Sequence, residues 1–94
     1  MLLKTKTALI YGAGGSMGSA IARAFAQEGA HVILTGRHLD PVQLLSEELI
    51  SKGGSAEAAQ VDALDEKAVG EHLASIIEKG RRIDISFNAV GYEV

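Results

Sequence analysis

A glycine-rich turn constrains the fold of this chain more than any other feature of its sequence. Thr7–Tyr11 is an apolar segment of strand type, and an amphipathic helical pattern over residues 16–28 follows the turn directly. Between the two, Gly12, Gly14 and Gly18 form a G-x-G-x-x-x-G pattern, one residue longer than the commonest dinucleotide-binding form. Glycine lets backbone N–H groups approach a pyrophosphate closely, and the following helix directs its positive N-terminus at the same group. The pattern is weak evidence alone, but the strand before it and the helix after it favour a nucleotide site.

The same order of strand, turn and helix repeats along the rest of the chain. Asp40 is expected to be the N-cap of a second helix, with Pro41 at its first position and Gly53 after its end. Asp65 is expected to cap a third helix, which Gly80 closes. The expected strands after the first cover residues 31–35, 56–61 and 83–87.

Apolar spacing predicts which helix faces are buried. Two hydrophobic staples are expected at helix starts, pairing Leu39 with Leu44 and Leu64 with Val69. The first and third helices each carry one apolar stripe at helical spacing. The predicted stripes are Met17, Ala20, Ile21, Ala24 and Phe25 in the first helix, and Val69, Leu73, Ile76 and Ile77 in the third.

These elements predict an α/β fold with an open parallel sheet. Each connection between strands contains a helix, which allows only parallel crossovers, so the helices cover both faces of the sheet. We expect four strands in the order 3-2-1-4. Ligands of such sheets bind beyond the carboxyl ends of the strands, where Arg37, Asp62 and Asn88 join the glycine turn. Four turns that converge on one crevice indicate a ligand site more specifically than the glycine turn alone.

Composition narrows the possible functions. The 94 residues suffice for one small domain, and 47% hydrophobic and 22% charged residues are typical of a globular protein. A net charge of −3 makes nucleic acid an unexpected partner. The absence of cysteine excludes disulfides and thiolate metal sites and fits a cytoplasmic protein, and no metal site is expected. No apolar run approaches the roughly 20 residues that a membrane-spanning helix requires.

At the level of motifs, the chain resembles the amino-terminal half of a short-chain dehydrogenase/reductase. The segment from Tyr11 to Gly18 occupies the place of the family's T-G-x-x-x-G-x-G motif, with Tyr11 in place of threonine and Ser16 in place of the middle glycine. Asp62 matches the family's aspartate after the third strand, which bonds the adenine amino group. Residues 88–91 match its N-N-A-G motif at two of four positions, and Ala89 replaces a bracing side-chain amide.

This resemblance implies a truncated Rossmann-type domain over residues 1–94 that binds a nicotinamide dinucleotide. The implied cofactor-binding residues are Gly12, Gly14, Gly15, Ser16, Met17, Gly18, Arg37, His38, Asp62, Ala63, Asn88, Ala89, Val90 and Gly91.

The end of the second strand predicts the choice of cofactor. Members that prefer NAD usually carry an acid there, which accepts hydrogen bonds from the ribose 2′-hydroxyl. Here Gly36 takes that position and Arg37 follows, with His38 as a further donor. A guanidinium offers a bidentate, charge-assisted contact to a 2′-phosphate, so NADP(H) is preferred over NAD(H).

The resemblance further implies an NADP(H)-dependent oxidoreductase that transfers hydride between the cofactor and a small-molecule carbonyl or alcohol. The family's catalytic serine and Tyr-x-x-x-Lys pair have no counterpart in these residues, because Tyr11 lies at the glycine turn and no lysine follows Tyr92. No catalytic residue is assigned, and the 94 residues alone are expected to be inactive, with the catalytic half absent. An uncovered fourth strand would favour association with another copy or chain.

Other classes of function fit less well. A non-catalytic NADP(H)-binding or regulatory module that pairs with another chain is the main alternative. A Rossmann-type methyltransferase would want an acid after the second strand, where Arg37 has the opposite charge. A P-loop phosphotransferase is disfavoured because no G-x-x-x-x-G-K-[ST] motif is present.

Overall fold

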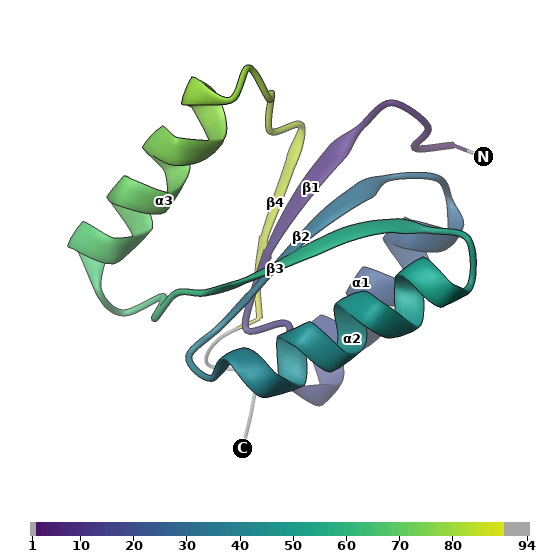
Figure 1. Cartoon of the computed structure of the whole chain (residues 1–94), viewed down its shortest axis with the longest axis horizontal. Helices are drawn as coiled ribbons and strands as arrows, with labels where there is room; N and C mark the ends of the chain where they lie inside the picture. Colours follow the sequence, from purple (N-terminus) through teal and green to yellow (C-terminus); the bar gives the residue numbers. More distant parts are fainter. Residues whose placement is uncertain (1, 90–94) are drawn as a thin grey trace.

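Four parallel strands form one sheet in the order β3-β2-β1-β4, as the sequence predicts. This computed structural model describes residues 2–89. Helices α1 and α2 lie on one face of the sheet and α3 on the other (Figure 1). In chain order the elements are β1 (Thr7–Tyr11), α1 (Ser16–Gln27), β2 (His31–Gly36), α2 (Leu39–Ser51), β3 (Ser55–Gln60), α3 (Glu66–Glu78) and β4 (Ile85–Asn88).

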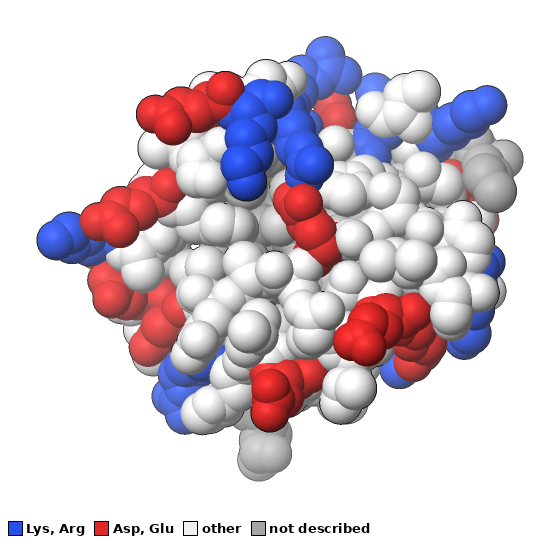
Figure 2. Space-filling view, viewed as in Figure 1, with Lys and Arg blue, Asp and Glu red and all other residues white. Residues whose placement is uncertain are grey.

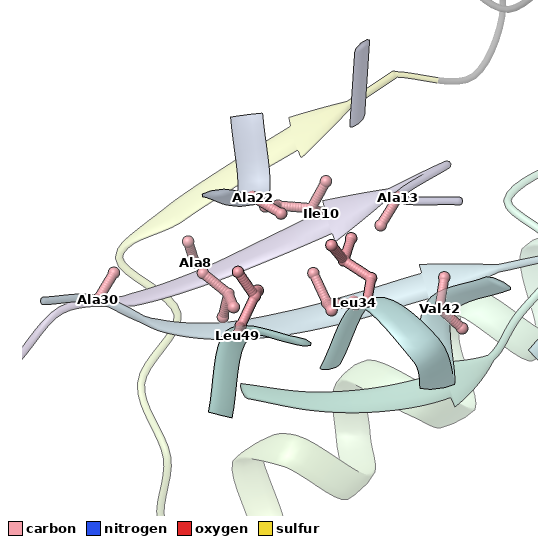
Figure 3. Packing of buried hydrophobic residues seen from close by; sticks show 10 residues of the cluster. Ala8, Ile10, Ala13, Ala22, Ala30, Leu34, Val42 and Leu49 are labelled. Atoms are coloured by element: carbon pink, nitrogen blue, oxygen red, sulfur yellow. The ribbon is translucent and has the colours of Figure 1, made fainter. Parts of the chain in front are cut away.

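The side chains of β1 alternate between two apolar clusters, one on each face of the sheet. Ala8 and Ile10 point to the face covered by α1 and α2, where Leu34 and Leu49 join them (Figure 3). Leu9 and Tyr11 fall in the smaller cluster on the α3 side. A strand buried on both faces is apolar throughout, which explains the unbroken apolar run at this position of the sequence.

Helix α1 packs through its smallest residues. Gly18 and Ala22, one turn apart, are its buried positions, while Ile21 and Phe25 are half-buried at the edge of the core. Met17 is 41% exposed, so the predicted apolar stripe does not coincide with the buried face. The small residues allow the helix to approach β1 closely, which a face of large side chains would prevent.

Helix α2 begins earlier than expected, and the assignment of Asp40 as its N-cap is wrong. The N-cap is His38, in extended backbone, so Asp40 lies in the first helical turn and Pro41 at the third position. This position suits proline because the first four N–H groups of a helix have no partner within it. The Asp40 carboxylate still complements the positive end of the helix dipole.

Helix α3 has one buried residue, Ile76, and packs on the smaller of the two apolar clusters. Ile76 is buried against Leu9 and Ile33, whereas Ile77, predicted to share the buried face, is 65% exposed. Asp65 caps this helix as predicted, and its side chain accepts a hydrogen bond from the Ala68 N–H at 3.1 Å.

The first predicted hydrophobic staple, Leu39 with Leu44, is wrong, because it was counted from Asp40 and the N-cap of α2 is His38. Leu44 is 67% exposed, so most of its side chain faces solvent. The second staple keeps its spacing around the Asp65 N-cap and stays a prediction, although Leu64 is 76% exposed.

Strand ends differ from the expected limits by one or two residues. β3 runs from Ser55 to Gln60 because it pairs in register with β2 from His31 to Gly36. β4 starts at Ile85, two residues late. Asp84 precedes the ladder and bonds Thr7 through both its backbone N–H and its side chain, at 2.9 Å each.

On the face seen in Figure 1, most charged side chains lie towards the edge, with acidic and basic groups interspersed (Figure 2). Basic and acidic groups also meet near the middle of this face. Among residues 2–89, no helix combines the length and apolarity that crossing a membrane would require.

Candidate functional site

A cleft of about 470 Å³ opens at the carboxyl ends of β1, β2 and β3. Its size falls within the range typical of small-molecule sites. The turn after each of these strands supplies part of its wall, as expected for an open parallel sheet. The lining residues are Gly12, Gly14, Gly15, Gly36, Arg37, His38, Pro41, Val61, Asp62, Ala63 and Leu64.

The glycine turn forms the floor of the cleft. Gly12 has a φ of 72°, in the left-handed region that side chains other than glycine rarely adopt. The Gly15 N–H donates to the Gly12 carbonyl at 3.2 Å, and the Ala13 N–H donates to the Thr35 carbonyl at 2.9 Å. These bonds tie the turn to itself and to β2, so its backbone is held in one conformation.

The start of α1 is suited to an anion. Its N-cap is Gly15, which has no side chain to cap the first-turn N–H groups of the helix. Among the residues that the structure describes, that first turn holds no acidic side chain. Uncapped N–H groups and the positive end of the helix dipole together favour a phosphate beside the turn.

Two of the motif glycines pack closely against other parts of the protein, and packing requires a glycine at Gly18. A Cβ on Gly18 would lie 2.2 Å from the Gly12 carbonyl oxygen, closer than atoms can approach. A Cβ on Gly14 would lie 3.1 Å from the Pro41 Cβ, so this glycine lets the start of α2 pack against the turn. Gly18 is buried and does not line the cleft, whereas Gly14 is exposed and lines it.

Arg37 and His38 stand at the exit of β2, on the wall of the cleft. Both are exposed, and within residues 2–89 the Arg37 guanidinium has no hydrogen-bond or ion-pair partner. His38 is the N-cap of α2 without a capping hydrogen bond from its side chain. Among the described residues, the Arg37 guanidinium without a partner and the His38 imidazole without a capping hydrogen bond therefore stand on the same wall of the cleft.

Asp62 also lines the cleft, two residues beyond the end of the neighbouring strand β3. Its Oδ1 accepts a hydrogen bond from the Leu64 N–H at 3.0 Å, and its carbonyl accepts one from the Asp65 N–H at 2.9 Å. The Asx turn fixes the carboxylate while its second oxygen keeps acceptor capacity. Ala63 and Leu64 place apolar surface directly beside it.

The cleft gathers seven of the predicted residues and leaves the others at different places. Gly12, Gly14, Gly15, Arg37, His38, Asp62 and Ala63 line it. Met17 and Gly18 lie in α1 behind the turn, as does Ser16 at the helix start. Asn88 pairs with Tyr11 at the end of β4, and the Ala89 N–H donates to the Tyr11 carbonyl at 2.9 Å. Val90 and Gly91 are outside the described residues.

Four lining residues were missed by sequence reasoning: Gly36, Pro41, Val61 and Leu64. Gly36, Val61 and Leu64 each directly flank a predicted residue, so strand-end motifs wider by one residue include them. Pro41 was assigned only to the helix start, and no local pattern indicates that it packs on Gly14.

Tyr11 is buried in the cluster on the α3 side of the sheet and does not line the cleft. Burial raises the pKa of its phenol above the ordinary value, which makes the phenolate less accessible. Within the described part of the chain, no three histidine or carboxylate side chains are grouped closely enough to hold a metal ion.

Comparison with known proteins identifies the chain's relatives. The family model described as short chain dehydrogenase matches residues 6–94. The uncharacterized oxidoreductase YxbG of Bacillus subtilis is 36% identical over 91 residues, which cover 97% of this chain and 33% of that protein.

Two solved structures share the fold. A metagenomic short-chain oxidoreductase in complex with NADP superposes with a TM-score of 0.87 at 28% identity, covering 92% of this chain and 39% of that one. An oxidoreductase from Haemophilus influenza with bound NAD gives a TM-score of 0.82 at 26% identity, covering 89% of this chain and 30% of that one. The present chain thus spans about a third of the length of these relatives.

Proposed function

Because this chain belongs to the short-chain dehydrogenase family, we propose that its cleft binds the nicotinamide dinucleotide of an oxidoreductase and prefers NADP(H). Residues 1–94 would then be the cofactor-binding part of the domain. The bound nicotinamide would supply the hydride acceptor or donor for a small carbonyl or alcohol substrate. Solved relatives with NADP and with NAD exist, so preference must depend on side chains of the cleft.

The glycine turn and the start of α1 are proposed to hold the pyrophosphate. The uncapped first turn of the helix provides backbone donors, and Gly12, Gly14 and Gly15 keep side chains out of the approach. Donor groups without carboxylates suit a dianionic group, so the residues present fit this part of the cofactor.

Asp62 and its neighbours are proposed to hold the adenine. The carboxylate oxygen that remains beside its bond to Leu64 can accept a hydrogen bond from an exocyclic amino group. Ala63, Val61 and Leu64 offer apolar surface to a planar ring at the same place.

The unpaired guanidinium of Arg37 is the single observation that carries the preference for NADP(H). An arginine already paired with a carboxylate would have to exchange one anion for another, whereas Arg37 has no such partner among residues 2–89. It lies on the cleft wall directly after Gly36, which takes the position where members that prefer NAD carry an acid. A 2′-phosphate there gains a charge-assisted contact that a 2′-hydroxyl cannot provide.

Hydride transfer is proposed to need residues beyond these 94. The described cleft offers no tyrosine beside a lysine, since Tyr11 is buried on the α3 side of the sheet. We therefore propose that the 94 residues by themselves bind cofactor without turnover. Association of copies through the outer edge of β4, which pairs only with β1 among the described strands, is a further part of this proposal.

Calorimetric titration of the chain with NADPH and with NADH tests the proposal. Arg37→Ala should weaken NADPH binding by about 10- to 100-fold, the range for a hydrogen bond to a charged group, and change NADH binding less than about twofold. Arg82→Ala is the matched control, because Arg82 is equally cationic but lies before β4 and pairs with Asp84. Equal weakening of both cofactors would overturn the preference, and no binding of either cofactor would overturn the site.

A further inference from the structure

The turn that carries Arg37 is attached to β3 at two successive carbonyl groups. The Val61 N–H donates to the Gly36 carbonyl at 3.0 Å, continuing the ladder between the strands. At the next residue, the side-chain amide of Gln60 donates from Nε2 to the Arg37 carbonyl at 3.2 Å. The backbone of Arg37 is therefore held by a side chain where the ladder itself has ended.

The second contact is not a consequence of regular pairing. The last register pair of the two strands is Gly36 with Gln60, and Arg37 lies beyond it. At this position a backbone carbonyl normally bonds to water, since no strand partner remains. The Gln60 side chain thus supplies a hydrogen bond to the backbone one residue beyond the end of β2, at Arg37 itself.

The other side of the turn is fixed by packing. A Cβ on Gly36 would lie 3.0 Å from Val42 Cγ1, so the turn is seated closely on the first part of α2. With Gly36 fixed there, the remaining freedom of the turn lies at Arg37 and His38, both exposed. The hydrogen bond from Gln60 acts on this freedom and on no other part of the cleft.

We infer that Gln60 is a positioning residue for recognition of the cofactor's 2′-phosphate, acting through the Arg37 backbone. This inference rests on the proposed function of the cleft. Gln60 does not line the cleft and touches no predicted ligand atom, so its effect passes through the direction in which the Arg37 side chain leaves the turn. A long side chain on an unanchored turn loses more conformational freedom on binding, which lowers affinity for the group that it contacts.

The inference separates two parts of the ligand. Asp62 and the glycine turn are held by their own hydrogen bonds, none of which involves Gln60. Loss of the Gln60 amide should therefore weaken only ligands that carry a phosphate at the 2′ position. Adenosine with a 5′-phosphate should bind as before.

Titration with 2′-AMP and 5′-AMP, followed by NMR of the backbone amides, tests this without the nicotinamide half or any turnover. Gln60→Met keeps the length of the side chain and removes its donor. It should weaken 2′-AMP binding about three- to tenfold, the range for one neutral hydrogen bond, and change 5′-AMP binding less than about 1.5-fold. In the chain without ligand, amide shifts should change at residues 37 and 38 and stay constant at Gly15 in the glycine turn.

Gln27→Met is the matched control, because Gln27 is exposed at the far end of α1 from the turn. It should leave both affinities unchanged. Equal 2′-AMP binding by wild type and Gln60→Met would overturn the inference while leaving the proposed site in place. Failure of 2′-AMP to bind the wild-type chain at all would overturn the 2′-phosphate site and the inference with it.

Discussion

A Cβ on Gly18 would lie 2.2 Å from the carbonyl oxygen of Gly12, so these two glycines define how closely α1 packs on the turn after β1. The two residues are six apart in the sequence and belong to the same glycine motif. Position 12 requires glycine because its φ of 72° is left-handed, and position 18 requires glycine because a Cβ there would collide with the Gly12 carbonyl. The fold therefore requires these two glycines whether or not a ligand binds.

Gly18→Ala should destabilise the protein by about 3 kcal/mol, near the upper end of the range for overpacking, since the obstructing atom is backbone and cannot rotate away. Urea unfolding followed by circular dichroism would measure this. Gly70→Ala is the matched control, because Gly70 lies within α3 and a Cβ there meets no atom within 4 Å. That change should stabilise the chain by up to about 1 kcal/mol through helix propensity. Equal effects of both substitutions would contradict this account of Gly18.

Asp62→Ala should weaken NADPH and NADH equally, by about tenfold, because the adenine is common to both cofactors. Competition by each cofactor against a fluorescent adenine nucleotide would give the two affinities. Asp62→Asn keeps an acceptor for the Leu64 N–H and so separates loss of the Asx turn from loss of the carboxylate. An effect confined to NADPH would show that Asp62 acts near the 2′-phosphate instead.

Ile76→Ala should cost about 2–4 kcal/mol of folding free energy, whereas Ile77→Ala should cost less than about 1 kcal/mol. The two residues are adjacent in α3, but Ile76 is 3% exposed and Ile77 is 65% exposed. Thermal unfolding of the two variants under one set of conditions compares them directly. Similar losses would mean that α3 turns a different face to the sheet.

Stability should fall as the pH is lowered from 7.5 to 5.5, because burial lowers the pKa of His31 and of His72 in the folded chain. The two imidazoles therefore bind protons more readily in the unfolded state than in the folded state. The contribution of the neutral imidazoles to the free energy of unfolding is complete above about pH 6.5 and declines below it. Neutral His31 accepts a hydrogen bond at Nε2 from Arg81 at 3.1 Å, and its Nδ1 is 2.5 Å from Ser55 Oγ. Protonation would set a second cation against Arg81, only partly offset by Glu57, whose carboxylate lies 3.9 Å from His31 Nε2.

His31→Gln should flatten part of this decline, since glutamine has no proton to gain in this range. Urea midpoints at several pH values for the wild type and the variant would test the prediction. A wild-type midpoint that rises as the pH falls would show that the Glu57 carboxylate dominates over burial and over Arg81.

The fold was largely predictable because its signals are local. Apolar runs and glycine turns fixed the number, kind and order of elements, and the helical connections required parallel strands. The cap at Asp65 could also be predicted, because an N-cap bonds an N–H only three residues away. The errors arose where two residues compete for one role, as His38 and Asp40 do at the start of α2.

The candidate site was predictable to the extent that strand ends converge. Residues at the carboxyl ends of β1, β2 and β3 meet in one cleft because parallel strands end at the same edge of the sheet. The contact of Gln60 with Arg37 joins residues 23 apart in sequence and depends on the register of β3 against β2. No spacing within the sequence encodes that register directly.

By itself, the sequence determined the order of elements, the parallel sheet and the chemical groups at its strand ends, since each depends on residues close together along the chain. Tertiary structure decided which apolar residues are buried, as with Ile76 and Ile77, and why Gly18 must be glycine. It also decided that Arg37 stands on the cleft wall with no partner for its guanidinium among residues 2–89, while Gln60 holds its backbone. These outcomes depend on distances between separate elements, and those distances exist only once the helices have packed on the sheet.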